Sequence, residues 1–281
     1  MSIFGTGTDA IPIPKFIYAL RIWEGNKYVD FQEYAGGAEL TAELEDGWYL
    51  PDDLASLVAQ VFSEASSGAS GASAIYSCSF DRSTDMFTIS KTASGASSYA
   101  NNRFDILFNS GTSTASGAGS ALGYSVASDA TGASAYEADN ELPNRLIPSQ
   151  PIREPFARFE GLNRSAIAES GIFSSRHIRT DIRFEFAMIY IPENEVKDEW
   201  AKWMGKVDEV EGAWLRQLDF EFYPKATNQD YIVLHPDESD WDLREMHQSN
   251  LPAFYEWRMS CRETIPKAGT WSLADIYTRI P

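Results

Sequence analysis

The sequence predicts a β-rich α+β protein of two domains, with antiparallel β-sandwich or barrel-like sheets that each carry one short amphipathic helix. Many short segments are rich in β-branched and aromatic residues or alternate apolar and polar residues, which is typical of strands. Two segments instead space their apolar residues as a helix does. The 281 residues suffice for two domains of ordinary size, and 43% of them are hydrophobic, which allows each domain a core.

The first domain is expected over residues 1–142. Six segments in it have the composition of strands: 16–23, 27–34, 39–44, 75–80, 86–91 and 103–108. The segments 75–80 and 86–91 are separated by five residues of turn type and predict a hairpin. A helix is expected from Pro51 to about Ser66, because five apolar residues share one helical face: Leu54, Leu57, Val58, Val61 and Phe62.

Four tracts of small residues interrupt this domain: 65–73, 92–98, 110–121 and 127–135. Serine, glycine and alanine bury too little apolar surface to offset the entropy that a chain loses when it is ordered. We therefore expect these tracts to be mobile in the isolated chain, whereas neighbouring subunits in an assembly would order them.

A proline-rich stretch at 143–156 predicts an extended connector to a second domain over 157–281. Strands are expected in the second domain at 179–191, 214–223, 231–234 and 254–262. A helix is expected after Pro192, because an apolar stripe with helical spacing follows it: Val196, Trp200, Trp203, Met204 and Val207.

The chain carries 41 acidic and 23 basic residues, a formal net charge of −18. Such a surface repels phosphate backbones and anionic membranes, so neither nucleic acid nor a membrane is expected as a partner. The charge either keeps a concentrated subunit soluble or complements one basic partner. The first residues lack a secretory signal, and Cys78 and Cys261 form no CxxC pair, so we expect synthesis in the cytoplasm with reduced thiols.

Residues for catalysis or metal binding do not gather in the sequence. The histidines His177, His235 and His247 show none of the spacings typical of zinc ligands on one element. The acidic segment 237–240 lacks the spacing of a calcium loop and favours a solvated loop. Phosphate-binding glycine loops and nucleophile elbows do not occur. We therefore expect no catalytic residue, no cofactor and no metal, and interpret the protein as non-enzymatic.

Three tryptophans are candidates for a subunit interface: Trp200, Trp203 and Trp241. The helical spacing of Trp200 and Trp203 favours a place in the core or at an interface over a sugar-stacking platform. Trp241 lies in an acidic segment and remains a candidate for an exposed contact, including contact with a carbohydrate.

Residues 41–139 resemble a module that recurs in virion proteins of tailed phages. The shared pattern is a strand, a G-x-Y-x-P-x-x-L-A helix start, a hairpin, an F-x-x-L-F-x-S-G-T strand, an L-G-[FY] turn and a closing T-G-A-x-x-Y. The matching residues are Gly47, Tyr49, Pro51, Leu54, Ala55, Phe87, Ile89, Phe104, Leu107, Phe108, Gly111, Leu122, Gly123, Tyr124, Thr131, Gly132 and Tyr136. This resemblance implies a virion protein without specifying which virion part.

Residues 176–262 resemble the ring-forming domain of distal tail and baseplate proteins in the order of their strands and their Trp-rich helix. The resemblance implies a structural subunit of a bacteriophage tail tip that forms a ring-shaped homo-oligomer, with a hexamer as one option. It also implies the tail tube and the tail hub or fibre proteins as partners, and the virion tail as the location. Two other functions stay open: a receptor- or carbohydrate-binding module of a tail, and an enzyme that acts on the cell wall.

Overall fold

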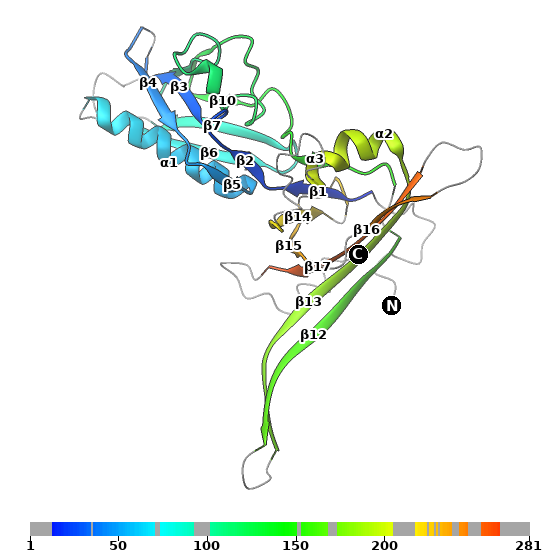
Figure 1. Cartoon of the computed structure of the whole chain (residues 1–281). Coiled ribbons are helices and arrows are strands. Elements are labelled where there is room, and N and C mark those ends of the chain that lie inside the picture. Colours follow the sequence, from blue (N-terminus) through cyan, green and yellow to red (C-terminus); the bar gives the residue numbers. More distant parts are fainter. Residues whose placement is uncertain are drawn as a thin grey trace. The chain divides into compact units, whose positions relative to one another are not determined.

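The computed structural model divides the chain into two compact units (Figure 1). Unit 1 consists of residues 1–18 and 146–281, and unit 2 consists of residues 19–145. Unit 2 is therefore an insertion into the chain of unit 1. The structure describes residues 13–34, 36–70, 74–92, 102–150, 153–167, 173–204, 217–223, 225–227, 229, 231–237, 242–246 and 254–264.

Unit 1 is built on an eight-stranded sheet in the order β11-β1-β14-β15-β17-β13-β12, with β16 also paired to β17. The strands are β1 (Lys15–Tyr18), β11 (Arg145–Leu146), β12 (Arg153–Ile167), β13 (Phe173–Pro192), β14 (Phe220–Tyr223), β15 (Ile232–Pro236), β16 (Asp242–Met246) and β17 (Phe254–Glu263). The pairings from β1 through to β12 are antiparallel. Strand β1 brings the N-terminal part of the chain into this sheet, more than 200 residues from its partner β14.

A short helical segment covers the apolar face of the unit 1 sheet. It consists of α2 (Glu193–Glu195), a π-helical turn η3 (Val196–Trp200) and α3 (Ala201–Met204). The stripe expected from the sequence is buried where its side chains are described, at Val196, Trp200 and Trp203. The ring of Trp203 lies 5.3 Å from that of Phe16, and the ring of Trp200 lies 4.5 Å from that of Trp257. The core of unit 1 is thus an aromatic cluster between this segment and the sheet.

Unit 2 contains one long helix, α1 (Pro51–Ser70), and three small antiparallel sheets in the orders β10-β7-β6, β2-β5 and β4-β3-β8-β9. Their strands are β2 (Leu20–Ile22), β3 (Tyr28–Gln32), β4 (Glu39–Glu43), β5 (Gly47–Tyr49), β6 (Ile75–Asp81), β7 (Met86–Thr92), β8 (Phe104–Ile106), β9 (Ala130–Ala133) and β10 (Ala135–Glu137). A 3₁₀ turn, η2, lies at Thr114–Ser116. The apolar stripe of α1 faces the core, where Phe62 stacks on Phe31 at 4.6 Å.

The structure confirms the β-rich α+β class and the hairpin of β6 and β7, and it differs from the expected elements at several places. The short strands β5, β9, β10 and β11 were not expected, and of the strand expected at 214–223 the described part begins at Phe220. The expected strand at 16–23 is interrupted at Ala19, so that β1 and β2 join different sheets. Helix α1 continues to Ser70 instead of ending near Ser66. The region read as a proline-rich connector contains the start of the long strand β12, and β16 was not expected at all.

Candidate assembly surface

A two-stranded extension of the unit 1 sheet is the most prominent feature of the described chain (Figure 1). Strands β12 and β13 pair along their whole length, from Arg153↔Ala187 to Ile167↔Phe173. Strand β17 pairs with β13 only at Arg183–Pro192. We call the remaining hairpin, residues 159–167 and 173–182, the arm. At about 3.4 Å per residue the arm spans roughly 30 Å.

Among the described residues, both edges of the arm lack a paired strand. Strand β12 ends the order of the sheet, and within the described residues no strand pairs with β13 beyond Arg183. A free edge presents a row of N–H and C=O groups on which another chain can add a strand. A two-stranded ribbon is also marginally stable alone in water, so contact with a partner would stabilise it.

The base of the arm is held by a charged cluster where β13, β15 and β17 meet. The Arg183 guanidinium donates to the Ser260 hydroxyl at 2.7 Å and lies 3.3 Å from the buried carboxylate of Asp237. The other carboxylate oxygen of Asp237 lies 2.6 Å from Nε of Arg262. The Ser260 hydroxyl in turn donates to Asp237 at 3.2 Å. One carboxylate therefore compensates two arginines that the register places directly opposite each other.

Two of the three candidate interface tryptophans lie in the core beneath this sheet. Trp200 and Trp203 are both almost fully buried. The indole N–H of Trp200 donates to the Glu195 carboxylate at 2.9 Å, and the same carboxylate accepts the Ser149 N–H at 3.1 Å. Trp241 lies outside the described residues. In the isolated chain, Trp200 and Trp203 therefore support the sheet from which the arm projects.

Tyr190 marks a strained position at the other end of β13. It has a φ of 63°, and it lies where the pairing of β13 with β17 shifts between Met188 and Ile191. A bulky residue with positive φ is costly in backbone energy. The ring is 39% exposed and meets that of Phe254 edge-on at 6.1 Å. The sequence could not predict this strain, because a positive φ at a single residue produces no pattern of residue types along the chain.

Carboxylates order two of the small-residue tracts of unit 2. Asp129 accepts the N–H groups of Asn109 and Ser110 at 2.8 and 3.0 Å and the Ser110 hydroxyl at 2.6 Å. Glu39 accepts both the N–H and the hydroxyl of Thr112 at 2.7 Å. Burial opposes ionisation of Asp129, but these hydrogen bonds outweigh it and lower its pKa. In contrast to the expected mobility, the tracts 110–121 and 127–135 are held by these charged acceptors.

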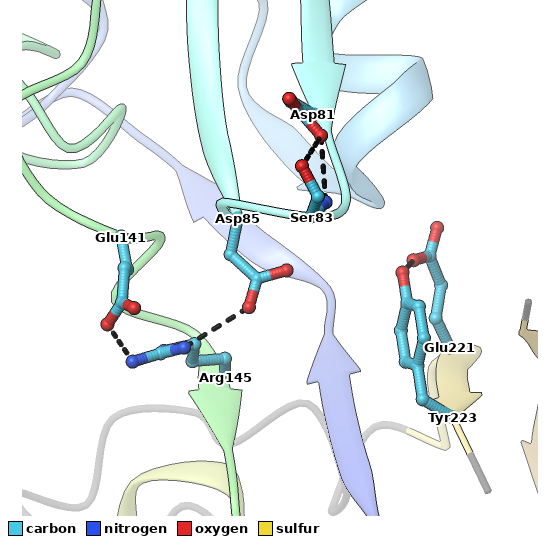
Figure 2. Close-up of polar contacts among 7 residues, drawn as sticks. All are labelled: Asp81, Ser83, Asp85, Glu141, Arg145, Glu221 and Tyr223. Carbon is cyan, nitrogen blue, oxygen red and sulfur yellow. Dashed lines mark hydrogen bonds and ion pairs between the residues drawn. The ribbon is translucent and has the colours of Figure 1, made fainter. Parts of the chain in front are cut away.

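A second group of polar contacts fixes a turn and the end of unit 2 (Figure 2). The Asp81 carboxylate accepts the N–H and the hydroxyl of Ser83 at 2.8 and 2.6 Å, and these bonds lower the pKa of Asp81. Arg145 lies 3.2 Å from Asp85 and also bonds the Glu141 carboxylate. The first contacts hold the turn between β6 and β7, and the second join the end of unit 2 to that turn, which are structural roles.

The same figure shows a buried pair in the unit 1 sheet, where the Tyr223 hydroxyl donates to Glu221 at 2.5 Å (Figure 2). The ammonium of Lys15, which is also buried, lies 4.2 Å from the centre of the Tyr223 ring. Adjacent strands β1 and β14 bring these residues together, with Lys15 directly opposite Tyr223. The contact of the buried lysine with the aromatic face favours the pairing of β1 with β14.

Residues for metal binding or membrane insertion do not stand out in the described part of the chain. There, no three His, Cys, Asp or Glu side chains gather to hold a metal ion. Of the three histidines considered as metal ligands, only His235 has a described side chain. Its Nδ1 lies 2.8 Å from the Asp219 carboxylate at an exposed position. None of the helices in the described ranges is long and apolar enough to cross a membrane.

The matches of this chain among solved structures include two distant likenesses. Neither a protein-family model nor a curated protein matches this chain. A protein in the tail of an empty GTA particle with C6 symmetry is similar over 46% of this chain and 85% of its own, at 13% identity and a TM-score of 0.25. The mavirus penton protein is similar over 90% of this chain and 84% of its own, at 8% identity and a TM-score of 0.28. At such TM-scores the likenesses do not establish a shared fold.

Proposed function

We propose that this protein is a non-enzymatic structural subunit of a virion, and that it forms a ring in the tail tip of a tailed phage between the tail tube and the hub or fibres. The observation that carries the proposal is the arm, a hairpin of roughly 30 Å that pairs with no further strand among the described residues and continues a sheet with an aromatic core. The resemblance of residues 41–139 and 176–262 to phage virion and distal tail proteins supports the same role.

The way in which the arm is anchored favours a mechanical role. Trp200 and Trp203 pack against the sheet on one side, and the cluster around Asp237 joins three strands at the point where the arm leaves. Force applied to the arm would be carried along strands that are hydrogen-bonded side by side. A subunit whose function is a surface needs such rigid supports for the elements that meet its neighbours.

The proposal is tested by the mass and shape of the purified protein, with light scattering coupled to negative-stain microscopy. We expect closed rings, either from the protein alone or after addition of tail tubes. A matched variant replaces residues 159–182 by an Asn-Gly turn between Arg158 and Arg183, which suits a two-residue hairpin. This variant is expected to stay monomeric and to remain unbound when tails are sedimented.

Assembly by the arm-less variant to the same rings as the full chain would refute the role of the arm. A full chain that stays monomeric and never sediments with purified tails would refute the structural role itself. The non-enzymatic part of the proposal is tested separately by zymography on peptidoglycan and polysaccharide, where cleared zones would contradict it. Binding on a glycan array, without incorporation into tails, would instead favour the receptor- or carbohydrate-binding module.

A further inference from the structure

One segment of unit 2 is ordered although it buries no side chain. Residues 109–117, which we call the polar segment, are asparagine, serine, glycine, threonine and alanine, and every one of them is exposed or partly exposed. Directly after it, Ala118, Leu122 and Tyr124 are almost fully buried. Ordering a backbone costs conformational entropy, which apolar burial usually offsets. In the polar segment, hydrogen bonds take over this role.

Carboxylates accept most of the N–H groups at the start of the polar segment. Four of its first five residues donate to a carboxylate at N···O distances of 2.6–3.0 Å: Asn109 and Ser110 to Asp129, Thr112 to Glu39, and Ser113 to Asp30. The hydroxyls of Ser110 and Thr112 donate to the same carboxylates as their N–H groups. Hydrogen bonds to an ionised acceptor are about twice as strong as those between neutral groups. The order of the polar segment therefore depends on three negative charges.

Hydrogen-bond donors, and not cations, surround these three acceptors among the described residues. Residues 104–144 contain no lysine or arginine. Ion pairs elsewhere in unit 2 engage its basic side chains: Lys27 with Glu24 and Glu43, Arg82 with Asp52, and Arg145 with Asp85 and Glu141. On the adjoining strand β8, the Asp105 carboxylate accepts the N–H of Gly132 at 2.6 Å. The ionised form of the three acceptors is therefore stabilised chiefly by the donors of the polar segment.

The geometry leaves little room for a proton on these carboxylates. Both oxygens of Asp129 accept hydrogen bonds from the polar segment. One oxygen of Asp30 accepts the Ser113 N–H, and the other accepts the Thr41 hydroxyl at 2.7 Å. A Cβ atom at Gly111 would lie 2.5 Å from Oδ2 of Asp30, so the backbone of the polar segment packs directly on this carboxylate. A proton added to either oxygen would place a donor where a donor already lies.

The polar segment covers part of strand β3. The backbone of Gly117 forms a bridge with Tyr28, and the polar segment lines a small cavity together with Val29, Leu107 and Phe108. These three apolar side chains are almost fully buried. Displacement of the polar segment would expose them, together with backbone groups of a strand edge, and such a surface can accept another chain.

We propose that the polar segment is an acid-released latch, which protonation of Asp30, Glu39 and Asp129 opens while the rest of unit 2 stays folded. The inference concerns unit 2 alone and does not depend on the proposed function. Burial opposes ionisation of Asp129, but the bonds from the polar segment outweigh it and lower the pKa of this carboxyl. Protonation of Asp129 must in turn favour the open segment. Carboxyl groups of free peptides take up a proton near about pH 4, so we expect opening below that pH.

The test measures amide hydrogen exchange in the full-length protein by mass spectrometry, expressed as protection relative to an unstructured peptide. The neutral variant carries Glu39→Gln and Asp129→Asn, which keep the size of each side chain and remove its charge at pH 7. The matched control carries Glu45→Gln and Asp53→Asn, at exposed positions of unit 2 outside the contacts of the polar segment. Peptides from α1 report whether unit 2 remains folded.

At pH 7 we expect the amides of residues 109–117 to exchange at least about tenfold faster in the neutral variant than in the natural chain, because several charge-assisted bonds are weakened at once. Peptides from α1 should keep their protection in both variants, and the control should keep the polar segment closed. In the natural chain, protection of residues 109–117 should fall by a similar factor between about pH 5 and about pH 3. The neutral variant should show a smaller fall, because two of its three acceptors are already uncharged.

Unchanged exchange of residues 109–117 in the neutral variant would overturn the inference. So would a natural chain in which these amides are already unprotected at pH 7. If α1 loses its protection together with the polar segment, in the variant or in acid, the carboxylates stabilise unit 2 as a whole and the segment is not a separate latch. A control that opens the segment as far as the neutral variant does would trace the effect to the net charge of unit 2, which also contradicts the inference.

Discussion

Replacement of Trp203 by alanine distinguishes a core residue from an interface residue. The side chain is 1% exposed, and its ring lies 5.3 Å from Phe16 and 5.9 Å from Tyr18. A buried tryptophan removes about 150–250 Å² from water. At about 25 cal/mol per Å² this corresponds to about 4–6 kcal/mol. Because the alanine keeps part of that contact, we expect Trp203→Ala to lower the free energy of unfolding of unit 1 by about 3–5 kcal/mol.

The assay is urea unfolding followed by tryptophan fluorescence and by far-ultraviolet circular dichroism. The two units can unfold separately, so the transition assigned to unit 1 must be the one that shifts. Trp23→Ala serves as the matched control, because Trp23 is 48% exposed in unit 2. The control is expected to change stability by about 0.5 kcal/mol or less.

A small effect of Trp203→Ala on unfolding would refute this reasoning. If the variant unfolds within about 1 kcal/mol of the natural chain but loses self-association, Trp203 contributes chiefly to a subunit interface. If it loses stability without any change in the association of the folded molecules, the residue acts through the core. Comparison of association well below the unfolding midpoint separates the two effects.

Three further substitutions test two carboxylates and one strained backbone position. Asp237→Ala removes the carboxylate beside Arg183 and should lower the free energy of unfolding of unit 1 by about 1.5–3 kcal/mol in urea unfolding. An unchanged free energy of unfolding would show that the cluster does not stabilise the sheet. Asp129→Ala should cost unit 2 about 1–2 kcal/mol at pH 7. Because the folded state lowers the pKa of Asp129, this contribution is present above about pH 3.9 and disappears as the pH falls through the lower folded pKa. A difference in unfolding free energy between variant and natural chain that does not shrink at pH 3 would contradict this prediction. Glycine adopts a positive φ with little strain, so Tyr190→Gly should leave the free energy of unfolding unchanged or raise it by up to about 1 kcal/mol in thermal unfolding. A large loss would show that the packing of the Tyr190 ring contributes more than the backbone strain costs.

Local patterns in the sequence were sufficient for most single elements. The i, i+4, i+8 spacing of Leu54, Val58 and Phe62 predicted α1, and the stripe through Trp200 and Trp203 predicted the helical segment of unit 1. Such patterns report which face of an element is apolar. They do not report which other element covers that face, because the partner is selected by the whole chain.

The arm could not be foreseen for a related reason. Pro155 and the neighbouring prolines favour an extended chain, which the sequence suggests equally for a connector and for an edge strand. The opposed pairs Glu160↔Asp181 and Arg164↔Arg176 exist only once the register is known. A shift by one residue would exchange the faces of a strand, so the partners along the arm are a property of pairing and not of composition.

The sequence by itself determined the β-rich class and the presence and faces of its main helices and strands, because these depend on residues a few positions apart. Tertiary structure alone decided that β1 belongs to a sheet with β14, that unit 2 is an insertion, and that distant carboxylates hold the tract from 110 to 121. The hydrogen bonds that order this tract reach Glu39 across 73 residues and Asp30 across 83 residues. Contacts over such separations leave no periodic trace in the sequence, since their energy is gained only after the chain between them has closed into a loop.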